Sequence, residues 1–365
     1  MFSLHVDTAR TWRGGQAQVL MTVLGLRERG HRAALVAHPE GVLWQRASEG
    51  HDLIPVAASG ELDLGAAWRL SRVIKQLGPE VLHAHDSHAV AMAASAVSMA
   101  SPSPRPPLVM SRRVDFHVRR NALSRWKYNQ VDCFVCASAA IRKMIVDDGV
   151  PPDRAVVVHD GVDVGFVDKT PAASIHEAFW LPHHAPLVAN VAAMVPHKGQ
   201  RHLVEAAAIV VRQIPDARFV IFGEGELRES IERQIRGHNL EKHVLLAGFR
   251  PNVLSLCKTM DLFVMSSVTE GLGSALLDAM ACRKAVVGTT AGGIPEAVVD
   301  GETGLLVPPR DHQALAEAIV RMLRDDALRS RFGEAGRRRV EEHFSADRMV
   351  SGVLGVYERV LRGEP

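Results

Sequence analysis

Short apolar runs alternate with longer stretches of helical periodicity along the first half of the chain. The pattern predicts a helix over residues 19–29, which ends at Gly30. It predicts strands over residues 2–6, 32–37, 80–85, 108–111, 133–137 and 155–159. Because strands that alternate with helices are typical of parallel sheets covered on both faces, we predict an α/β domain, with residues 13–16 as the loop after its first strand.

The same alternation returns in the second half, after an interruption. Between Val164 and Pro186 the strand periodicity lapses and prolines recur, which is typical of a domain boundary. Beyond it we predict a hairpin-like turn over residues 300–308, a last helix over about 346–362, and strands over residues 187–193, 218–222, 244–248, 261–267 and 285–288. The pattern therefore predicts two α/β domains, over residues 1–165 and 186–345.

Composition narrows the choice of partner. The 365 residues are 47% hydrophobic and 5% aromatic, and 43 basic against 41 acidic residues leave a net charge of +2. So weak a field does not favour nucleic acid, and few rings are present to stack on bases or sugars. No apolar run approaches the roughly 18 to 20 residues that cross a bilayer, and no signal core follows the N-terminus, so we predict a cytoplasmic protein.

Basic residues nevertheless gather in two places. Arg337 to Arg339 precede Glu341 and Glu342, a pattern that we interpret as a salt-bridged surface helix. The other cluster has Asp115 as its only nearby acid. It would either face phosphates or an anionic membrane surface, or simply lie on a solvated helix face. It consists of Arg112, Arg113, Arg119, Arg120, Arg125 and Lys127.

Cysteine and histidine spacing does not indicate a metal or redox centre. Cys133 and Cys136 form a C-x-x-C in a strand-like run, and no second pair exists to complete a zinc site, so we interpret them as core residues. The 18 histidines are scattered, and His183 with His184 lacks the i, i+4 spacing of a helix-borne metal pair. We predict no metal and no cofactor.

The stretch from Glu270 to Asp278 carries the most chemical information. A buried strand precedes it, so the turn falls at a carboxyl end, where open parallel sheets bind ligands. A helix is expected to begin near Gly273, and its free N–H groups and positive dipole end suit a diphosphate. The pattern thus predicts a nucleotide-sugar site.

Further motifs follow the predicted strands in a characteristic order, and together they resemble the retaining group-1 glycosyltransferases. In the second half they are Lys198-Gly199, Gly223 to Gly225, Gly248 to Arg250, Glu270 and Asp278 separated by seven residues, Gly292 to Glu296, and Gly301 to Gly304. In the first half they are Arg13 to Gly15, His83 to Asp86, and Asp160 to Asp163. The resemblance implies the GT-B fold, with two facing Rossmann-like domains, an interdomain cleft and a C-terminal helix, about 346–365, that packs back on the first domain.

The resemblance also implies roles for individual residues. Glu270 resembles the carboxylate that contacts the donor sugar, Asp278 the one that holds the ribose hydroxyls, and Lys198 the cation on the donor diphosphate. Glu270 and Lys198 are the implied catalytic residues. Further positions of the implied donor site are Gly14, Gly15, Gly223, Arg250, Gly271, Leu272, Gly273, Ser274 and Ala275.

Two positions depart from the family pattern. Asp278 replaces a glutamate, and Ala193 stands five residues before Lys198, where the family has an arginine that shares the diphosphate. We hypothesise that Arg112 or Arg113 restores the missing charge. Two histidines, His85 and His117, are candidate sugar contacts or else structural residues.

By resemblance we expect a metal-independent, retaining, hexosyl-type transferase. It would move a sugar from a nucleotide-diphosphate sugar to a glycan or lipid-linked acceptor in cell-envelope or lipopolysaccharide synthesis, with a peripheral contact to an anionic membrane. Two alternatives stay open: a non-catalytic relative that binds sugar nucleotides, and an epimerase or phosphorylase of the same fold. A dinucleotide oxidoreductase is disfavoured because residues 13–16 do not complete G-x-G-x-x-G.

Overall fold

The chain divides into two compact units in a computed structural model that describes residues 1–47, 52–60, 63–118 and 121–364. Unit 1 comprises Met1–Gly161 and Ala346–Pro365, and unit 2 comprises Val162–Ser345. The chain thus leaves unit 1 before the boundary predicted between Val164 and Pro186. The cause is that the intervening residues belong to unit 2: Ile175 is fully buried in its core, and the Ala173 N–H donates to the Ser255 carbonyl at 3.0 Å.

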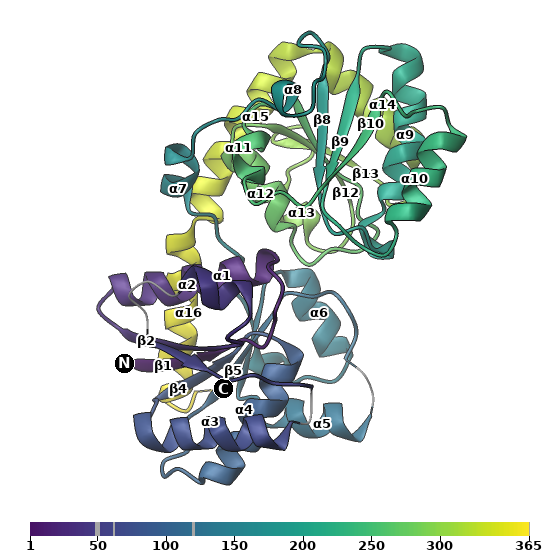
Figure 1. Cartoon of the computed structure of the whole chain (residues 1–365). Helices are drawn as coiled ribbons and strands as arrows, with labels where there is room; N and C mark the ends of the chain where they lie inside the picture. The colour runs from purple at the N-terminus through teal and green to yellow at the C-terminus, as the bar shows by residue number, and fades with distance from the viewer. Residues whose placement is uncertain (48–51, 61–62, 119–120, 365) are drawn as a thin grey trace. The chain divides into compact units, whose positions relative to one another are not determined.

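Unit 1 is built on a parallel sheet of seven strands in the order β3-β2-β1-β4-β5-β6-β7 (Figure 1). The strands are β1 (Phe2–Val6), β2 (Arg32–Ala37), β3 (Asp52–Pro55), β4 (Val81–Ala84), β5 (Leu108–Arg112), β6 (Cys133–Cys136) and β7 (Ala155–Val157). Inner strands such as β1 and β4 are buried along their whole length because helices cover both faces. The order reverses between β1 and β4, which is where such sheets open a crevice at their carboxyl ends.

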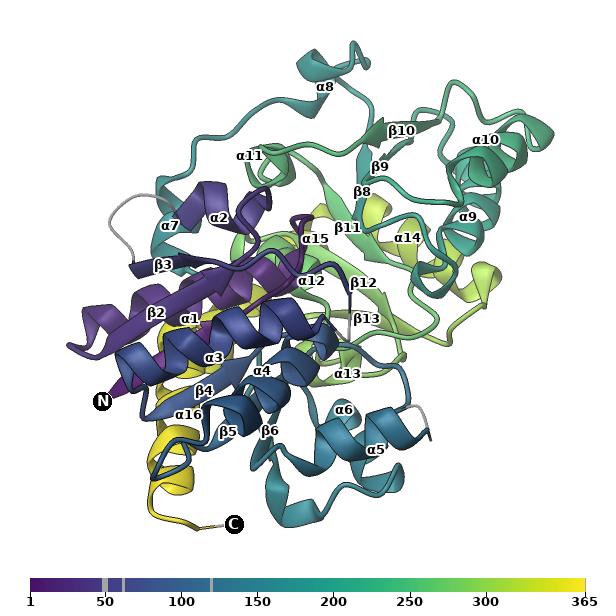
Figure 2. The ribbon, with the colours of Figure 1, turned by 60° about the horizontal axis from the view of Figure 1, so that its bottom comes forward.

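Two helix layers cover this sheet. Apolar side chains of α1 and α16 share one core cluster, and those of α3 and α4 share another with the opposite strand face (Figures 1 and 2). The helices are α1 (Gly14–Glu28), α2 (Val42–Ala47), α3 (Leu64–Leu77), α4 (Ser87–Ala100), α5 (Ala122–Asn129), α6 (Ala139–Asp147), the 3-10 helix η1 (Pro152–Arg154) and α16 (Ala346–Leu361). Helix α1 begins at Gly14 rather than at residue 19, because the Arg13 N–H donates to Gln16 Oε1 at 3.1 Å and caps an earlier start.

Unit 2 is built on a parallel sheet of six strands in the order β10-β9-β8-β11-β12-β13. The strands are β8 (Leu187–Val191), β9 (Arg218–Phe222), β10 (Val244–Gly248), β11 (Leu262–Met265), β12 (Ala285–Thr289) and β13 (Gly304–Val307). The helices are α7 (Val164–Lys169), α8 (Ile175–Ala178), the 3-10 helix η2 (Pro196–Lys198), α9 (Gln200–Gln213), α10 (Arg228–Gly237), α11 (Val253–Cys257), α12 (Ser274–Ala281), α13 (Ile294–Ala297), α14 (His312–Arg324) and α15 (Asp326–His343). The order of this sheet reverses between β8 and β11.

In unit 2 one local prediction was wrong and another was confirmed only in part. The segment from residue 300 to 308 is no hairpin: after a turn closed by the Gly301 N–H and the Gly304 carbonyl, β13 pairs parallel to β12. The salt bridge predicted for the helix of Arg337 does form, with Arg337 Nε donating to Glu341 Oε1 at 2.6 Å. Arg337 is nevertheless buried rather than on a solvated face, since it also donates to Asp168 at 2.7 and 2.9 Å and to the Ala281 carbonyl at 2.7 Å. Its guanidinium thereby joins α15 to α7 and α12.

Candidate donor-binding site

The reversal of strand order in unit 2 brings two predicted site residues together. Lys198 ends the 3-10 turn η2 that follows β8, and Glu270 lies in the loop that follows β11. Because β8 and β11 are hydrogen-bonded neighbours, both residues emerge at the same carboxyl edge of the sheet. Lys198 Nζ lies 2.8 Å from Oε1 and 2.7 Å from Oε2 of Glu270.

Glu270 is held in place from more than one side. It is 7% exposed, and its Oε2 also accepts a hydrogen bond from Ser267 Oγ at 2.8 Å. Its own carbonyl accepts the N–H of Gly293 at 3.1 Å. The carboxylate therefore has a fixed position and direction before any ligand arrives.

Glycines permit the backbone contacts around this loop. A Cβ on Gly292 would lie 1.9 Å from the Glu270 carbonyl oxygen, and one on Gly199 would lie 2.1 Å from that of Ser266. Both glycines also have a positive φ, of +52° and +65°. The motifs found in the sequence at these positions are thus requirements of close packing between the loops after β8, β11 and β12.

The helix predicted near Gly273 begins there. Gly273 adopts a left-handed conformation with φ of +94° and precedes α12, whose first residue is Ser274. Gly271, Leu272 and Gly273 are buried, whereas Ser274 and Ala275 are partly accessible. The start of α12 therefore presents its N–H groups and positive dipole end beside Lys198 and Glu270, an arrangement suited to an anion.

Asp278 lies farther along the same helix in a different environment. It is half-buried, and no hydrogen bond or ion pair to its carboxylate occurs among the described residues. Burial raises the pKa of this carboxyl to about 7. A carboxylate without protein partners keeps its lone pairs for a ligand.

Other predicted donor-site positions in unit 2 are less closely tied to this centre. Gly223 packs its Cα against the Ala192 carbonyl, where a Cβ would approach within 2.1 Å. Arg250 is exposed, donates Nε–H to the Ala247 carbonyl at 3.1 Å, and places its guanidinium 5.1 Å from the centroid of the Phe179 ring. Among the described residues, no hydrogen bond, ion pair or ring contact joins Arg250 to Lys198 or Glu270.

The predicted site residues of unit 1 gather only in part. Gly14 and Gly15 form the first turn of α1, and a Cβ on Gly15 would meet nothing within 4 Å. Arg113 donates to Asp160 Oδ1 at 2.8 Å and lies 3.3 Å from His85 Nδ1. The hypothesis that Arg113 replaces the family arginine stays a prediction, and it requires this cation to leave or share Asp160.

Two other candidates lie in different settings. Arg112 is buried and donates to the Phe116 carbonyl, so its guanidinium serves the local loop. His117 is exposed on the surface, where its Nδ1 lies 2.9 Å from Asp148 Oδ1. Unlike His85, this histidine makes no hydrogen bond, ion pair or ring contact with the described residues at the strand ends of unit 1.

Sequence reasoning missed a buried cluster of histidines in unit 1. His5 lies in β1, His83 in the adjacent strand β4 and His85 just after the end of β4, and their ring nitrogens come within 4.8 Å of one another. Alternate positions 83 and 85 on one strand were the available signal, but only strand pairing brings His5 beside them. Burial lowers the pKa of His5 to about 3 and holds those of His83 and His85 well below the usual value.

Hydrogen bonds join these histidine rings to one another and to neighbouring side chains in a polar network. Arginine only donates, so His85 Nδ1 accepts from Arg113, and His85 Nε2–H then donates to His5 Nδ1 at 2.9 Å. Tyr357 of α16 lies 2.6 Å from His83 Nδ1, and Ser111 lies 2.8 Å from its Nε2. In this arrangement His85 Nε2 carries a proton and cannot also bind a metal.

Two family models match the chain one after the other. The model of glycosyltransferase family 4 matches residues 12–166, and that of glycosyl transferases group 1 matches residues 173–339. Each therefore covers most of one structural unit. The chain belongs to the group-1, family-4-like glycosyltransferases.

This glycosyltransferase is similar in sequence to two bacterial enzymes. It is 27% identical over 353 residues to the lipopolysaccharide core biosynthesis glycosyltransferase LpsE of Rhizobium meliloti, with 96% of each chain covered. It is also 27% identical over 244 residues to the N-acetyl-alpha-D-glucosaminyl L-malate synthase of Bacillus anthracis, covering 67% of this chain and 64% of that one.

Solved structures show the fold of the transferase. The crystal structure of HepE from Anabaena, in complex with UDP and glucose, superposes with a TM-score of 0.84 at 20% identity and covers 98% of this chain and 99% of the other. The two parallel sheets with flanking helices thus form the GT-B fold.

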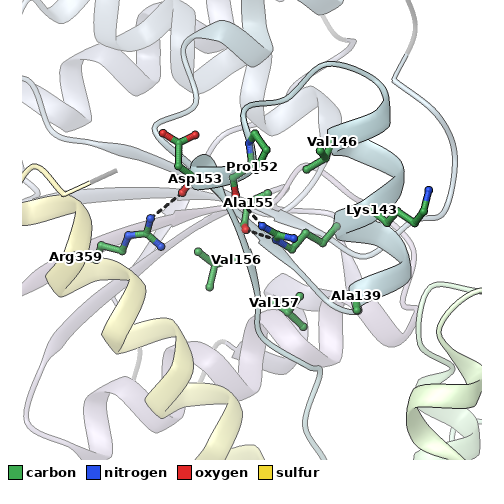
Figure 3. A pocket seen from close by; sticks show the side chains of 10 residues that line it. Ala139, Lys143, Val146, Pro152, Asp153, Ala155, Val156, Val157 and Arg359 are labelled. Atoms are coloured by element: carbon green, nitrogen blue, oxygen red, sulfur yellow. Dashed lines mark hydrogen bonds between the residues drawn. The ribbon is translucent and has the colours of Figure 1, made fainter.

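An open hollow of about 650 Å³ lies away from the residues discussed above, along the edge strand β7 of the transferase (Figure 3). Two arginines donate hydrogen bonds to backbone carbonyls at this edge. Arg142 donates to the Ala155 and Pro152 carbonyls at 2.7 and 3.0 Å, and Arg359 donates to the Asp153 carbonyl at 2.8 Å. These cations cover backbone acceptors and so protect the edge strand from pairing with other chains.

Proposed function

We propose that this glycosyltransferase moves a hexose from a nucleoside-diphosphate sugar, with retention of configuration and without a metal, to a hydroxyl of a glycan or lipid-linked acceptor in the cytoplasm. The observation that carries the proposal is the ion pair of Lys198 and Glu270 beside the start of α12. A cation, a fixed carboxylate and free N–H groups at one strand-order reversal suit a diphosphate that bears a sugar.

Each residue would act on a different part of the donor. Lys198 would face the diphosphate and offset the charge that grows on it as the glycosidic bond breaks. Glu270 would accept hydroxyls of the sugar and so place the anomeric carbon, while Asp278 would accept the ribose hydroxyls. A metal is not required for this scheme, since Lys198 and the α12 dipole together offset the charge of the leaving group.

The ion pair has a further consequence for donor binding. Lys198 and Glu270 neutralise each other at 2.7 Å, so an incoming diphosphate competes with Glu270 for the ammonium group. Lysine has three donors on a flexible stem, so it can turn one toward a phosphate and keep another on the carboxylate. The ion pair would thereby keep the Glu270 carboxylate in position, and binding of the phosphate to Lys198 would affect Glu270, the residue at the sugar.

The acceptor is proposed from the relatives. LpsE is named for lipopolysaccharide core biosynthesis, and it matches along 96% of both chains. We therefore propose a cell-envelope glycan, such as a lipopolysaccharide core or a lipid-linked sugar, as the acceptor class. UDP-sugars are the first donors to test because the HepE crystals hold UDP and glucose.

A donor-by-acceptor screen tests the proposal. UDP-, GDP- and ADP-sugars are incubated with lipopolysaccharide cores and lipid-linked sugars, and released nucleoside diphosphate and extended glycan are measured together. Glu270→Ala should lower turnover by about a hundredfold or more, whereas Glu317→Ala, at an exposed position of α14, should not change it. Proton NMR of the product should show the anomeric configuration of the donor.

Other outcomes would replace the proposal. Donor binding without turnover on any acceptor would identify a sugar-nucleotide-binding protein, an idea that Ala193 and Asp278 favour because both depart from the family pattern. Release of an isomerised sugar would identify an epimerase, and a requirement for inorganic phosphate a phosphorylase. A product of inverted anomeric configuration would refute only the retaining mechanism and leave the transferase activity in place.

A further inference from the structure

The loop that follows β11 is held by hydroxyl groups on both sides of the ion pair. Ser266 Oγ donates to the Lys198 carbonyl at 3.1 Å, and Ser267 Oγ donates to Glu270 Oε2 at 2.8 Å. Thr289, the last residue of β12, donates from Oγ1 to the Ser267 carbonyl at 2.6 Å. Two neighbouring serines thus hold one partner of the pair each, and the threonine holds the second serine.

None of these hydroxyl groups is placed to meet a ligand. Ser266, Ser267 and Thr289 are 1%, 1% and 2% exposed. A hydroxyl carries one proton, and carbonyl and carboxylate oxygens only accept, so each proton is committed to its partner inside the protein. Any effect of these residues on the reaction must therefore pass through Lys198 or Glu270.

Backbone contacts complete the support on the side of Lys198. The Val268 N–H donates to the His197 carbonyl at 2.7 Å, which ties the loop after β11 to η2. Gly199 packs closely on the same loop, since a Cβ there would lie 2.1 Å from the Ser266 carbonyl oxygen. The loops after β8 and β11 therefore pack as one body, in which the Ser266 hydrogen bond fixes the Lys198 backbone.

The hydrogen bonds to Glu270 are divided unequally between its two oxygens. Oε2 accepts from Lys198 Nζ at 2.7 Å and from Ser267 Oγ, whereas Oε1 accepts only from Lys198, at 2.8 Å, among the described residues. Each carboxylate oxygen has about two lone-pair sites, so Oε1 keeps one for a further donor. Ser267 thereby determines which oxygen of Glu270 remains available to a sugar hydroxyl.

The basic cluster predicted after β5 does not form a comparable arrangement. Lys127 is buried and its Nζ donates to Ser87 Oγ at 2.6 Å, whereas Arg125 on the same helix is exposed. Residues 119–120 lie outside the described part of the chain, and none of the described helices is long and apolar enough to span a bilayer. The cations of this cluster therefore differ in their surroundings, while Lys198 and Glu270 share one set of supports.

We infer that Ser266 and Thr289 are positioning residues of the donor site: Ser266 orients Lys198, and Thr289 orients Glu270 through Ser267. The inference rests on the proposed function, in which Lys198 meets the diphosphate and Glu270 meets the sugar. A misplacement of about 1 Å can lower turnover by about a hundredfold, even when the substituted residue never touches the substrate. The Thr289 hydroxyl is therefore expected to affect turnover from inside the protein.

Substitutions at Thr289 separate the effect of its hydroxyl from that of its shape. Thr289→Val keeps the branched side chain and removes the hydroxyl, whereas Thr289→Ser keeps the hydroxyl. With the most active donor and acceptor of the screen, kcat should fall by about tenfold or more in Thr289→Val and return to within about threefold of the wild type in Thr289→Ser. The affinity for UDP, measured by calorimetry, should not change in either variant because UDP has no sugar for Glu270 to contact.

Ser266→Ala should affect the phosphate side of the site instead. The substitution removes the hydrogen bond to the Lys198 carbonyl and loosens the ammonium group that would face the diphosphate. Both kcat and the affinity for UDP should therefore fall, each by about fivefold. Unchanged UDP affinity and kcat in Ser266→Ala would refute the role of Ser266.

A measurement of the ion pair itself keeps failure of this inference distinct from failure of the proposed transferase. In urea unfolding, the coupling between Lys198→Met and Glu270→Gln is measured in the wild-type and in the Thr289→Val background. A positioning role predicts that the coupling falls by about half in Thr289→Val. A merely structural role would lower the stability and leave the coupling as it is.

Thr22→Val is a matched control in unit 1. Thr22 is fully buried in α1 and its Oγ1 donates to the Gln18 carbonyl at 2.7 Å, so the substitution removes a similar hydrogen bond. It should lower stability while leaving kcat and the coupling of Lys198 with Glu270 unchanged. Wild-type kcat in Thr289→Val, or a coupling that Thr289→Val does not change, would overturn the inference. No turnover by the wild type, with a reduced coupling in Thr289→Val, would refute the transferase and support the positioning of the pair.

Discussion

Lys198 Nζ contacts both carboxylate oxygens of Glu270, at 2.8 and 2.7 Å, across the point where the unit 2 sheet reverses its strand order. The Lys198 side chain is 21% exposed and that of Glu270 is 9% exposed, so the two charges stabilise each other in a poorly hydrated place. The pair is at once a structural contact and the proposed centre of donor binding.

Removing the lysine should therefore destabilise unit 2 as well as inactivate it. Lys198→Met leaves the Glu270 carboxylate buried without its cation, and we expect the free energy of unfolding to fall by about 3 kcal/mol. Lys198→Met/Glu270→Gln should recover about half of that loss, because no unpaired charge remains. Urea unfolding of the wild type, both single variants and the double variant measures the coupling, and purely additive effects would contradict an energetically coupled pair.

Asp278 should make nucleotide binding depend on pH. Burial raises the pKa of its carboxyl to about 7, and only the ionised form accepts two ribose hydroxyls. The affinity for UDP should therefore rise between pH 6 and 8, and Asp278→Asn should lose the part of this rise that belongs to Asp278. Calorimetry of UDP binding to the wild type and to the variant measures this difference, because the protonation of UDP itself is the same in both experiments. Parallel pH profiles would remove Asp278 from the nucleotide site.

The same carboxyl should have the opposite effect on stability. Its folded-state pKa lies above the unfolded value of about 3.9, so the native protein binds an extra proton between about pH 4 and 7. Stability from this group is thus lost as the pH rises through that range. Asp278→Asn should raise the melting temperature more at pH 8 than at pH 4.5.

Gly292 should tolerate substitution much less well than Gly301. Both have a positive φ, of +52° and +74°, but a Cβ on Gly292 would lie 1.9 Å from the Glu270 carbonyl oxygen, whereas one on Gly301 would meet nothing within 4 Å. Gly301→Ala should cost about 1 to 2 kcal/mol from backbone strain alone. Gly292→Ala should cost more and displace Glu270, so that donor binding falls as well. Thermal melts and UDP titration compare the two variants, and equal losses would contradict a steric role.

Tyr357 should stabilise unit 1 through its hydroxyl. Tyr357→Phe removes the partner at 2.6 Å from His83 Nδ1 and leaves a buried ring nitrogen unsatisfied, at a cost of about 1 to 3 kcal/mol. The chain has only one other tyrosine, Tyr128, whose hydroxyl makes no hydrogen bond with the described residues. Tyr128→Phe is thus a matched control that should cost less than about 0.5 kcal/mol in urea unfolding. Similar costs for both would mean that the network contributes little.

Acid should unfold unit 1 by way of its histidines. The pKa of His5 is lowered to about 3, and those of His83 and His85 also lie well below 6.5, so only the unfolded chain takes up their protons. Stability is present above pH 6.5 and is lost as the pH falls below it. Asp7 opposes this partly, because burial and the neighbouring Asp86 raise its pKa to about 6. We expect a net loss of about 3 kcal/mol per pH unit near pH 5.

Tryptophan fluorescence can follow that loss in one unit. Trp180 is the only tryptophan of unit 2, so in Trp180→Phe the remaining indoles report on unit 1 alone. Urea unfolding of this variant at pH 7, 6 and 5 gives the slope. A free energy of unfolding that stays constant over this range would show that the histidines are not neutral and buried in the native protein.

Much of the fold could be predicted from the sequence because the buried strands of parallel sheets are recognisable as short apolar segments. Strands β2, β9 and β12 contain continuous apolar runs, and helix α1, before β2, ends next to Gly30. The start of α1 was missed because the side chain of Gln16, rather than a serine or aspartate, satisfies the N-terminal N–H group. The hairpin was a false prediction because a tight turn looks the same before a parallel or an antiparallel strand.

The helix that begins after Gly273 was predicted from the apolar strand and the glycine that precede it, and the resemblance of the sequence to the glycosyltransferases implied Lys198 and Glu270 as site residues. Their contact was decided by the tertiary structure, since only the pairing of β8 with β11 brings the two loops to one edge. Strand pairing likewise joined His5 to His83 and His85, and packing buried Lys127 while leaving Arg125 of the same helix in water. The sequence by itself determines residue types and local secondary structure. Which residues lie close together and which are exposed depends on which strands become neighbours and which helix face the core leaves uncovered.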